Sequence, residues 1–359
     1  MPVTLQIQVC QGILQRKKNI ICCAATGFGK SLTFMIPLLF NSKSIIVVVT
    51  ALNILGKQNV DALAKVGISA VAVSALNNDE ATFKVRRPGR HRLVVVNPEV
   101  LMETDGHFDQ LWKCKSFTDR LPSLVFDEAH CISVWGAFRP KYREISRLRY
   151  LLPSTVHYCL LSATLSPPVL ADISEILNLN PSNTVSFLRI NDRPNVFLGV
   201  EEMKHPASTY QDLNFLVPIV NGVGTLPDWK FIVFFDNIKI AEDACKHLQS
   251  RLPAKSEDQD RLIWFHSIMS DTYRETEAAA LTIGSRTGAF GTDSIGMGID
   301  IPDIKVIVQW RLTCNMESLW QRFGRAARDP SLEGIAILFV EPKYLDHEIL
   351  KVASKAASK

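Results

Sequence analysis

The sequence predicts an α/β protein made of two tandem domains, each with a mostly parallel β-sheet flanked by helices. Short apolar segments rich in Val, Ile and Phe recur along the chain, and segments with helical spacing lie between them. Strands that are apolar at nearly every position are buried on both faces, as in parallel sheets covered by helices. The pattern pauses at residues 180–194 and then repeats.

Six strands are predicted before the pause and six after it. The first set is 19–24, 44–50, 69–74, 92–97, 123–127 and 156–162, and the second set is 195–201, 230–235, 261–266, 287–291, 305–309 and 334–340. Apolar residues at helical spacing predict helices over 53–66, 169–177, 238–251, 271–283 and 316–327.

The domain boundary is expected in the pause, where Pro181, Asn183, Asn191 and Pro194 are typical turn and linker residues. A chain of 359 residues is long enough for two domains. We therefore expect a first domain over residues 1–185, a second domain over residues 186–345, and a basic tail over residues 346–359.

The composition is that of an ordinary globular protein, with 47% hydrophobic and 21% charged residues. A net charge of +4 permits a nucleic-acid partner without demonstrating one. The eight cysteines form no C-x-x-C pair, so we expect no zinc site and a reducing, intracellular environment. The first thirty residues lack the pattern of a signal peptide, and no apolar stretch has membrane-spanning length, so no membrane partner is expected.

Residues 24–31, Ala-Ala-Thr-Gly-Phe-Gly-Lys-Ser, follow a predicted strand and open a helix. In such a loop the backbone N–H groups point at phosphate oxygens, and glycines allow the close approach. Lys30 is expected to reach the β- and γ-phosphates of ATP, and the Ser31 hydroxyl to bind Mg²⁺. The remaining nucleotide contacts are expected from Ala25, Thr26, Gly27, Phe28 and Gly29.

Two acids, Asp127 and Glu128, stand at the end of another apolar strand, where open α/β sheets place their ligands. We expect Asp127 to hold Mg²⁺ through water and Glu128 to act as the general base that orients the attacking water. His130 is expected to sense the nucleotide state. Ser162 and Thr164, at the end of the sixth strand, are expected to bond to this acidic segment and to couple it to the second domain.

These motifs resemble those of superfamily 2 helicases, and residues 127–136 are similar to the D-E-A-H-C-I-S-x-W-G run of RecQ-like DEAH enzymes. The resemblance implies two RecA-like domains of the P-loop nucleotide-hydrolase type. It also implies an aromatic-rich loop that couples DNA contact to hydrolysis, in which Trp135, Phe138 and Arg139 stack on single-stranded bases. The family has two residues between the glycine and the phenylalanine of this loop, whereas this chain has only Ala137.

Further segments extend the resemblance over most of the chain. Residues 96–99 resemble the family's A-P-E segment, residues 50–52 and 58–60 its S-P-L and D-Q-V segments, and residues 193–195 part of its D-R-P-N segment. Residues 291–302 resemble the fifth helicase motif, which implies a nucleotide contact by Asp300. Residues 321–329 resemble the sixth motif, which implies a coupling role for Gln321 and γ-phosphate contacts by the guanidinium groups of Arg325 and Arg328.

The adenine-reading glutamine of the family corresponds best to Gln6, with Gln8 as the alternative. No aromatic residue precedes either one, so adenine recognition is weak or the sequence begins late. Two basic segments are candidates for phosphate contacts and equally for solvated surface. These are residues 86–92 and the helix that carries Lys141, Arg143, Arg147 and Arg149.

The resemblance implies an ATP- and Mg²⁺-dependent helicase that moves 3′ to 5′ on single-stranded and tailed duplex DNA, with a nuclear location if the source is a eukaryote. One alternative is a degenerate helicase that binds nucleic acid with little turnover. The other is an RNA-dependent ATPase, because residues 299–302 are similar to a DEAD-box segment. RNA is the less favoured partner, and the residue pattern does not specify an oligomeric state.

Overall fold

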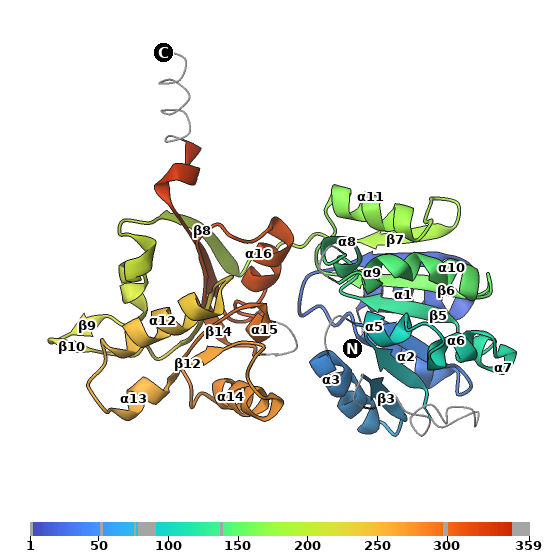
Figure 1. Ribbon diagram of the computed structural model, residues 1–359, viewed down its shortest axis with the longest axis horizontal. Coiled ribbons are helices and arrows are strands. Elements are labelled where there is room, and N and C mark those ends of the chain that lie inside the picture. Colours follow the sequence, from blue (N-terminus) through green and yellow to red (C-terminus); the bar gives the residue numbers. More distant parts are fainter. Residues whose placement is uncertain are drawn as a thin grey trace, which may run out of the picture. The chain divides into compact units, whose positions relative to one another are not determined.

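The computed structural model describes residues 3–50, 53–74, 77, 91–136, 139–296 and 301–346. The chain divides into two compact units, Met1–Asp192 and Arg193–Lys359, each built on one large parallel sheet (Figure 1). All twelve predicted strands are present, and their ends differ from the prediction by at most two residues. The predicted fold class is therefore confirmed.

The first unit contains a seven-stranded sheet in the order β3-β4-β2-β5-β6-β1-β7, in which all neighbours are parallel. Parallel strands bring their carboxyl ends to one edge of the sheet, which is where ligands bind in open α/β folds. The strands are β1 (Asn19–Cys23), β2 (Ile46–Val49), β3 (Ala70–Val73), β4 (Leu93–Val96), β5 (Ser123–Asp127), β6 (His157–Ser162) and β7 (Thr184–Leu188).

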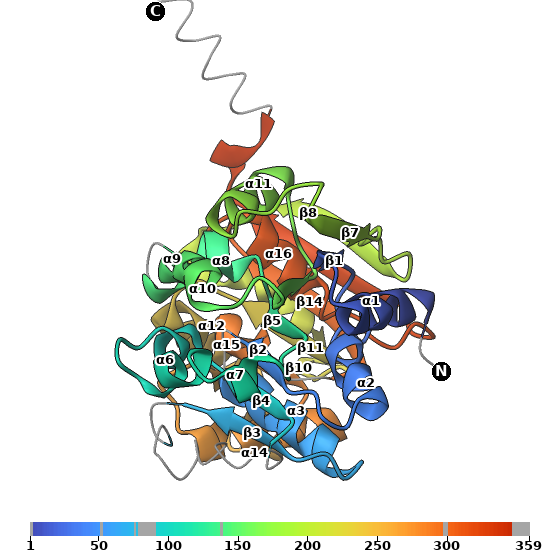
Figure 2. The ribbon, with the colours of Figure 1, turned by 90° about the vertical axis from the view of Figure 1, so that its right-hand side faces the viewer.

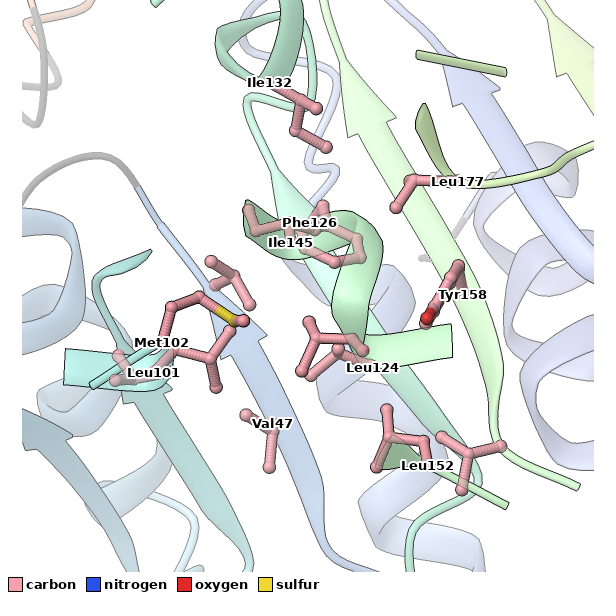
Figure 3. Packing of buried hydrophobic residues seen from close by; sticks show 14 of the residues in the cluster. Val47, Leu101, Met102, Leu124, Phe126, Ile132, Ile145, Leu152, Tyr158 and Leu177 are labelled. Atoms are coloured by element: carbon pink, nitrogen blue, oxygen red, sulfur yellow. The ribbon is translucent and has the colours of Figure 1, made fainter. Parts of the chain in front are cut away.

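Alternate side chains of these strands enter two cores, one on each face of the sheet. Val47 and Phe126 point into the core shown in Figure 3, whereas Val48 and Val125 point into the other. The first core is covered by α5 (Pro98–Leu101), α6 (His107–Trp112), α7 (Lys115–Thr118), α8 (Cys131–Val134), α9 (Lys141–Glu144), the 3₁₀ turn η2 (Ile145–Arg147), α10 (Leu148–Leu151) and α11 (Pro167–Ile176). The second core is covered by α1 (Thr4–Gln15), α2 (Leu32–Phe40) and α3 (Asn53–Ala64).

The segment predicted as a linker contains the edge strand β7, so that prediction was wrong for residues 184–188. Val185 lies opposite Ile20 and Phe187 opposite Cys22 in the ladder with β1. The strand is only five residues long and is flanked by Asn and Pro, which are typical of turns. The predicted boundary after residue 185 therefore falls inside a strand, whereas the structure divides the chain between Asp192 and Arg193.

The second unit contains a six-stranded parallel sheet in the order β12-β13-β11-β14-β15-β8. Its strands are β8 (Val196–Glu202), β11 (Lys230–Phe234), β12 (Leu262–Phe265), β13 (Gly288–Gly291), β14 (Ile304–Trp310) and β15 (Gly334–Val340), and β9 (Ile219–Val220) with β10 (Val223–Gly224) form a separate hairpin. The helices are α12 (Ile238–Gln249), α13 (Glu257–Asp260), α14 (Asp271–Ile283), α15 (Asp293–Gly296) and α16 (Met316–Phe323), with 3₁₀ turns η3 (Ala207–Thr209), η4 (Gln211–Leu216) and η5 (Pro342–Tyr344).

The eight cysteines are all thiols, and six of them are buried. Cys314 is half-buried, and Cys114, at the start of α7, is exposed. Over the described residues, no helix combines the length and the apolar character that crossing a bilayer requires.

Candidate functional site

The loop between β1 and α2 has the backbone of a phosphate cradle. Gly27 and Gly29 have positive φ angles of 79° and 73°, which side chains with a Cβ rarely adopt. The Lys30 ammonium group donates to the carbonyl oxygens of Ala24 at 3.0 Å and Ala25 at 3.2 Å. The sequence-predicted lysine is therefore folded back over its own loop, close to where a phosphate group is expected.

Gln6, on α1, holds this loop from one side. Its buried amide Nε2 donates to the carbonyl oxygens of Phe28 at 2.9 Å and Gly29 at 3.2 Å, and its Oε1 accepts from the N–H of Val3 at 2.9 Å. A Cβ on Gly29 would lie 2.5 Å from Nε2, so the glycine is also required by this contact. The adenine contact expected of Gln6 stays a prediction, and the structure adds a loop-holding contact.

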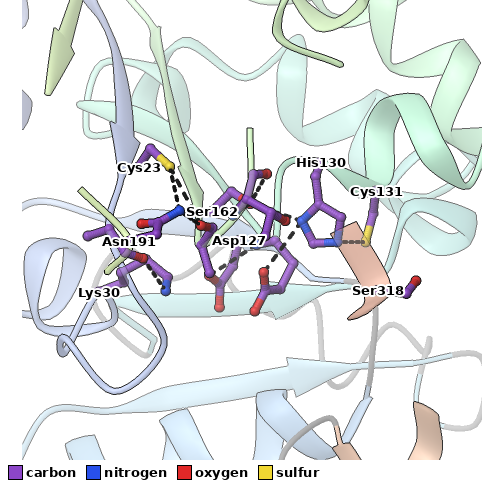
Figure 4. Close-up of polar contacts among 12 residues, drawn as sticks. Cys23, Lys30, Asp127, His130, Cys131, Ser162, Asn191 and Ser318 are labelled. Carbon is purple, nitrogen blue, oxygen red and sulfur yellow. Dashed lines mark hydrogen bonds and ion pairs between the residues drawn. The ribbon is translucent and has the colours of Figure 1, made fainter. Parts of the chain in front are cut away.

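The acidic pair lies at the carboxyl end of β5. Asp127 accepts a hydrogen bond from the backbone N–H of Glu128 at 3.1 Å. Desolvation at the strand end, together with the negative charge of Glu128, raises the pKa of Asp127 to about 7, although Lys30 lowers it. Figure 4 draws both side chains at this edge of the sheet, with the Lys30 ammonium group bonded to its own loop. Glu128 has a φ of 50°, and such backbone strain in a side chain-bearing residue often accompanies functional sites.

His130 joins the acidic pair to the end of β6 (Figure 4). Its Nδ1 lies 2.9 Å from Ser162 Oγ and 3.5 Å from a Glu128 carboxylate oxygen. The Ser162 hydroxyl donates to the carbonyl oxygen of Thr164 at 2.8 Å, so the proton of the His130–Ser162 bond is assigned to Nδ1. Nε2 then accepts from the Cys131 thiol at 3.4 Å. The structure thus brings together His130 and Ser162, which lie at the ends of different strands, and their predicted coupling role stays a prediction.

Asn191, in the segment that follows β7, also reaches this edge of the sheet and was missed from the sequence. Its amide donates to the carbonyl oxygen of Ala163 and to Cys23 Sγ, the latter at 3.7 Å (Figure 4). Asparagine in this segment was interpreted as a turn signal, and no local pattern distinguishes the two roles. Buried Thr164 Oγ1 lacks a hydrogen-bond partner among the described residues.

The donor set fits Mg²⁺ bound together with a nucleotide. Within the described part of the chain, no three His, Cys, Asp or Glu side chains converge as metal ligands. Mg²⁺ commonly takes one or two protein oxygens and completes its shell with water and phosphate oxygens. A desolvated carboxylate whose pKa is raised by a neighbouring acid is a group that a divalent cation stabilises, and Ser31, next to Lys30, is half-buried at the start of α2.

Arg139, in the aromatic loop after His130, is held by an ion pair with Glu99. Arg139 makes two hydrogen bonds to Glu99, at 2.8 and 2.5 Å, and its guanidinium lies over the rings of Trp135 at 5.5 Å and Tyr142 at 5.4 Å. Trp135 also packs against the core of the first unit. In this structure Arg139 is therefore engaged by protein groups, and its predicted stacking on bases requires the Glu99 pair to open. Phe138 lies outside the described residues.

The basic helix after this loop is mostly committed to internal contacts. Lys141 pairs with Glu144 at 2.9 Å, and Arg147 approaches the same carboxylate at 3.6 Å. Arg149 lies over the ring of Tyr158 at 4.1 Å. The other basic candidate, residues 86–92, falls mainly outside the described residues.

The second unit contains a buried arginine that the sequence reasoning missed. Arg322, on α16, is only 2% exposed and donates to Asp293 at 2.8 Å, to Asp236 at 2.6 Å and to Gln309. These partners come from three segments at the carboxyl edge of the sheet. Burial raises the pKa of Asp236, but the hydrogen bonds that this carboxylate accepts, foremost from Arg322, and the charge of Arg322 together lower it by more. The pKa of Asp236 therefore lies below its ordinary value.

The two arginines predicted to contact the γ-phosphate lie on the turn after α16, which ends at Phe323 rather than at residue 327 as predicted. Arg193 donates to the carbonyl oxygens of Gly324 (3.3 Å), Ala326 (2.9 Å) and Ala327 (2.6 Å), and these bonds replace the helical ones. Asn195 adds a bond to Ala327 at 2.9 Å. The segment 193–195 therefore anchors the turn that carries Arg325 and Arg328, both half-buried.

Comparison with known proteins finds a helicase domain in each of the two units. Residues 3–173 match the DEAD/DEAH box helicase family, and residues 213–330 match the helicase conserved C-terminal domain. The chain is 28% identical over 328 residues to the ATP-dependent DNA helicase Q-like 2 of Arabidopsis thaliana, covering 90% of this chain and 44% of the relative. It is 27% identical over 333 residues to the ATP-dependent DNA helicase RecQ of Bacillus subtilis (strain 168), covering 91% and 52%.

This chain is a RecQ-like superfamily 2 helicase core. The core spans about half of the length of these two relatives. Its fold is that of the DUF1998 helicase MrfA bound to DNA, with a TM-score of 0.74 and 19% identity over 99% of this chain and 51% of that one. It is also that of the DEAD-box helicase Mss116 bound to single-stranded RNA, with a TM-score of 0.71 and 19% identity over 95% and 70%.

Within each unit, the helicase core gathers most of its predicted site residues at one sheet edge. In the first unit these are the loop 24–31, Gln6, Asp127, Glu128, His130, Ser162 and Thr164. Gln321 lies on α16 of the second unit, beside Arg322. Asp300, Ala51 and Leu52 lie outside the described residues. The buried network of Arg322 had one sequence signal, since α16 places it between Leu319 and Phe323 on the buried face.

Proposed function

We propose that this helicase core is an ATP-driven motor that moves 3′ to 5′ on single-stranded DNA and opens tailed duplexes. The observation that carries the proposal is the cluster of Lys30, Asp127 and Glu128 at the carboxyl ends of β1 and β5, with the His130–Ser162 bond beside it. Such a cluster meets the needs of phosphoryl transfer, which depends on positioning and charge stabilisation. The preference for DNA is supported by relatives that are described as ATP-dependent DNA helicases. The proposed direction is the one that the resemblance of residues 127–136 to RecQ-like enzymes implies.

Each residue of the cluster has a proposed step. Lys30 leaves the carbonyl oxygens of Ala24 and Ala25 and neutralises the β- and γ-phosphates. Ser31 and Asp127 hold Mg²⁺, which when bound draws charge from the phosphate oxygens. Glu128 accepts a proton from the attacking water. Arg325 and Arg328 stabilise the charge that develops on the transferred phosphoryl group.

The coupling step is proposed to run through His130. Its Nδ1 proton is shared between Ser162 and the nearby Glu128 carboxylate, so a change in the charge of Glu128 alters the bond to β6. Ser162 in turn holds the backbone of Thr164. A change at the nucleotide is thereby transmitted to the segment after β6.

The test is DNA-stimulated ATP hydrolysis by the full chain, paired with strand separation on a 3′-tailed duplex. Lys30→Ala and Glu128→Gln are each expected to lower the stimulated turnover by about 10²–10⁴-fold. Lys43→Ala, an exposed lysine on the same unit, is the matched control and is expected to keep full activity. Undiminished turnover in either site variant would remove the proposed roles.

An RNA-dependent ATPase is the second candidate, because the fold is shared with an RNA-bound DEAD-box helicase. Equal-length DNA and RNA strands of the same sequence distinguish the two candidates. Stronger stimulation by RNA would replace the DNA assignment. Binding of either strand without hydrolysis by the unmodified chain would support the degenerate, binding-only alternative.

A further inference from the structure

Residues of α1, of the start of β1 and of the edge strand β7 line a groove in the first unit. Figure 2 shows the ribbons of α1 and β7 next to each other. It has a volume of about 360 Å³. Its floor is apolar and consists of Ile20, Val185 and Phe187. Gly12 allows α1 to lie close to this floor, since a Cβ there would be 2.7 Å from Ile20 Cδ1.

The groove has a polar wall and a basic end. Gln8, Gln11 and Gln15 follow each other along one face of α1 and supply amide groups that donate and accept hydrogen bonds. Lys17 and Lys18, both exposed, stand where α1 gives way to β1. This end is at the amino ends of the strands, whereas the phosphate loop follows the carboxyl end of β1. The groove is therefore separate from the nucleotide site.

The edge strand β7 offers its backbone to a further strand. It is last in the sheet order, and in the described part of the chain it pairs with β1 alone. Unpaired N–H and C=O groups of an edge strand form a template for an added extended chain. The half-buried Val185 and Phe187 alternate along β7 and line the groove, so they can receive every second side chain of such an addition.

The charge of the segments around the groove favours an acidic partner. The first sixty residues contain no Asp or Glu but six Lys and Arg residues, and residues 177–191, which include β7, also contain no acid. A chain that carries acids is thus attracted to the groove without an opposing carboxylate from these segments. The last residues of this chain are a poor match, because they carry Lys351, Lys355 and Lys359.

We infer that this groove is a docking site for an extended acidic peptide of a partner protein, in which apolar side chains alternate with Asp or Glu. The peptide adds to β7 as an edge strand, its apolar side chains contact Val185 and Phe187, and its acids lie near Lys17 and Lys18. A peptide is favoured over a nucleic-acid strand because the groove offers a backbone edge and only one aromatic ring, whereas single strands are bound on successive aromatic platforms.

The test uses the full chain and a fluorescein-labelled peptide of about eight residues that alternates Val or Ile with Asp or Glu, and it measures the dissociation constant by fluorescence anisotropy. The double variant Lys17→Glu/Lys18→Glu is expected to weaken binding by about tenfold or more, and added salt to weaken binding to the original chain. Lys17→Arg/Lys18→Arg is expected to retain binding within about twofold, because charge is kept.

Three controls keep the result specific. Lys43→Glu reverses an exposed charge away from the groove and should leave peptide binding unchanged. The charge-reversed variants should keep the thermal melting temperature and the DNA-stimulated ATPase rate of the original chain, since the lysines are exposed and distant from the phosphate loop. A peptide with Lys in place of its acids should not bind.

Several outcomes would overturn the inference. They are failure of the original chain to bind the peptide, equal binding by the charge-reversed variant, or equal binding of the Lys-containing peptide. Displacement of the peptide by a single-stranded oligonucleotide that itself depends on Lys17 and Lys18 would assign the groove to nucleic acid. A concentration-dependent dimer that the charge-reversed variant abolishes would assign it to a second copy of this chain.

Discussion

The carboxyl edges of the two sheets carry acids of opposite character. In the first unit, Asp127 is desolvated beside a second acid, and its pKa is raised to about 7. In the second unit, Asp236 and Asp293 share the buried guanidinium of Arg322, and the pKa of Asp236 is lowered. At the carboxyl edge of the first sheet the acidic pair therefore lacks a full cationic partner, whereas at the carboxyl edge of the second sheet the acids have one.

This difference indicates that the acids of the first unit are suited to binding a ligand, whereas the acids of the second unit support the local structure. An incomplete acidic pair gains stability when a cation arrives, so the first unit is suited to bind and release a charged ligand. A complete network fixes its own geometry, and Arg322 lies on the helix that leads directly into the turn with Arg325 and Arg328. The second unit thus holds the turn that carries these two arginines in a fixed geometry, and Arg193 is bonded to the same turn.

The largest effect on stability is expected for Arg322→Ala. It leaves Asp236 and Asp293 without their shared cation, so we expect the second unit to lose about 3–5 kcal/mol of unfolding free energy. Hydrogen exchange followed by mass spectrometry should show lost protection in β11, β14 and α16, with the first unit unchanged. Arg325→Ala, on the neighbouring turn, is the control and should retain that protection. An unaltered second unit in Arg322→Ala would show that the network is not a support.

In the absence of Mg²⁺ and nucleotide, we expect Asp127→Asn to raise the free energy of unfolding, whereas Arg322→Ala lowers it. A raised pKa in the folded state means that the folded protein loses stability as the pH rises from about 4 to about 7. The variant avoids this loss and should be more stable by on the order of 2 kcal/mol at pH 8, with no gain below about pH 4.

Urea unfolding of both proteins across this pH range measures the difference, and Mg²⁺ with ATP should stabilise only the original chain. The contribution of Asp236 to stability depends on pH in the opposite sense. Because its pKa is lowered, its contribution is complete above the unfolded value near 3.8 and is lost only as the pH falls through the lowered value. A first unit whose stability is independent of pH between 4 and 8 would contradict the incomplete-pair interpretation.

The smallest effect is expected for a substitution beside the phosphate loop. Gln6→Ala removes two hydrogen bonds to the loop carbonyl groups and should raise the KM for ATP several-fold while costing about 1 kcal/mol of stability. Gln8→Ala on the same helix is the control and leaves those bonds intact. Steady-state ATPase titrations decide between them, and a larger KM effect in Gln8→Ala would favour Gln8 as the nucleotide-contacting glutamine.

The parts of the fold that were predicted correctly are those that local sequence patterns determine. Strands such as β2 (Ile46–Val49) and β5 (Ser123–Asp127) are continuous apolar runs, and their burial follows directly from that pattern. The helix α1 was not predicted, because its interior contains Gly12 and its first turn contains no acid. The strand β7 was not predicted, because a short edge strand between turn residues has too weak a pattern.

The site was predictable where a motif is contiguous and not where it is assembled from distant segments. Lys30, Asp127 and Glu128 each stand in a recognisable run. The hydrogen-bond partners of Arg322 lie up to 86 residues away from it along the chain, and no local pattern pairs them with it. The same holds for Glu99 and Arg139, which were assigned to different segments and meet in an ion pair.

The thiol of Cys114 gives this protein a built-in attachment point. It is exposed, whereas burial raises the pKa of the half-buried Cys314 to about 11 and six other thiols are inaccessible. Maleimide dyes react with thiolates, so a single fluorophore should attach to the first unit at neutral pH without prior removal of any cysteine. An acceptor dye on DNA would then test, one molecule at a time, whether this unit moves along a strand as proposed.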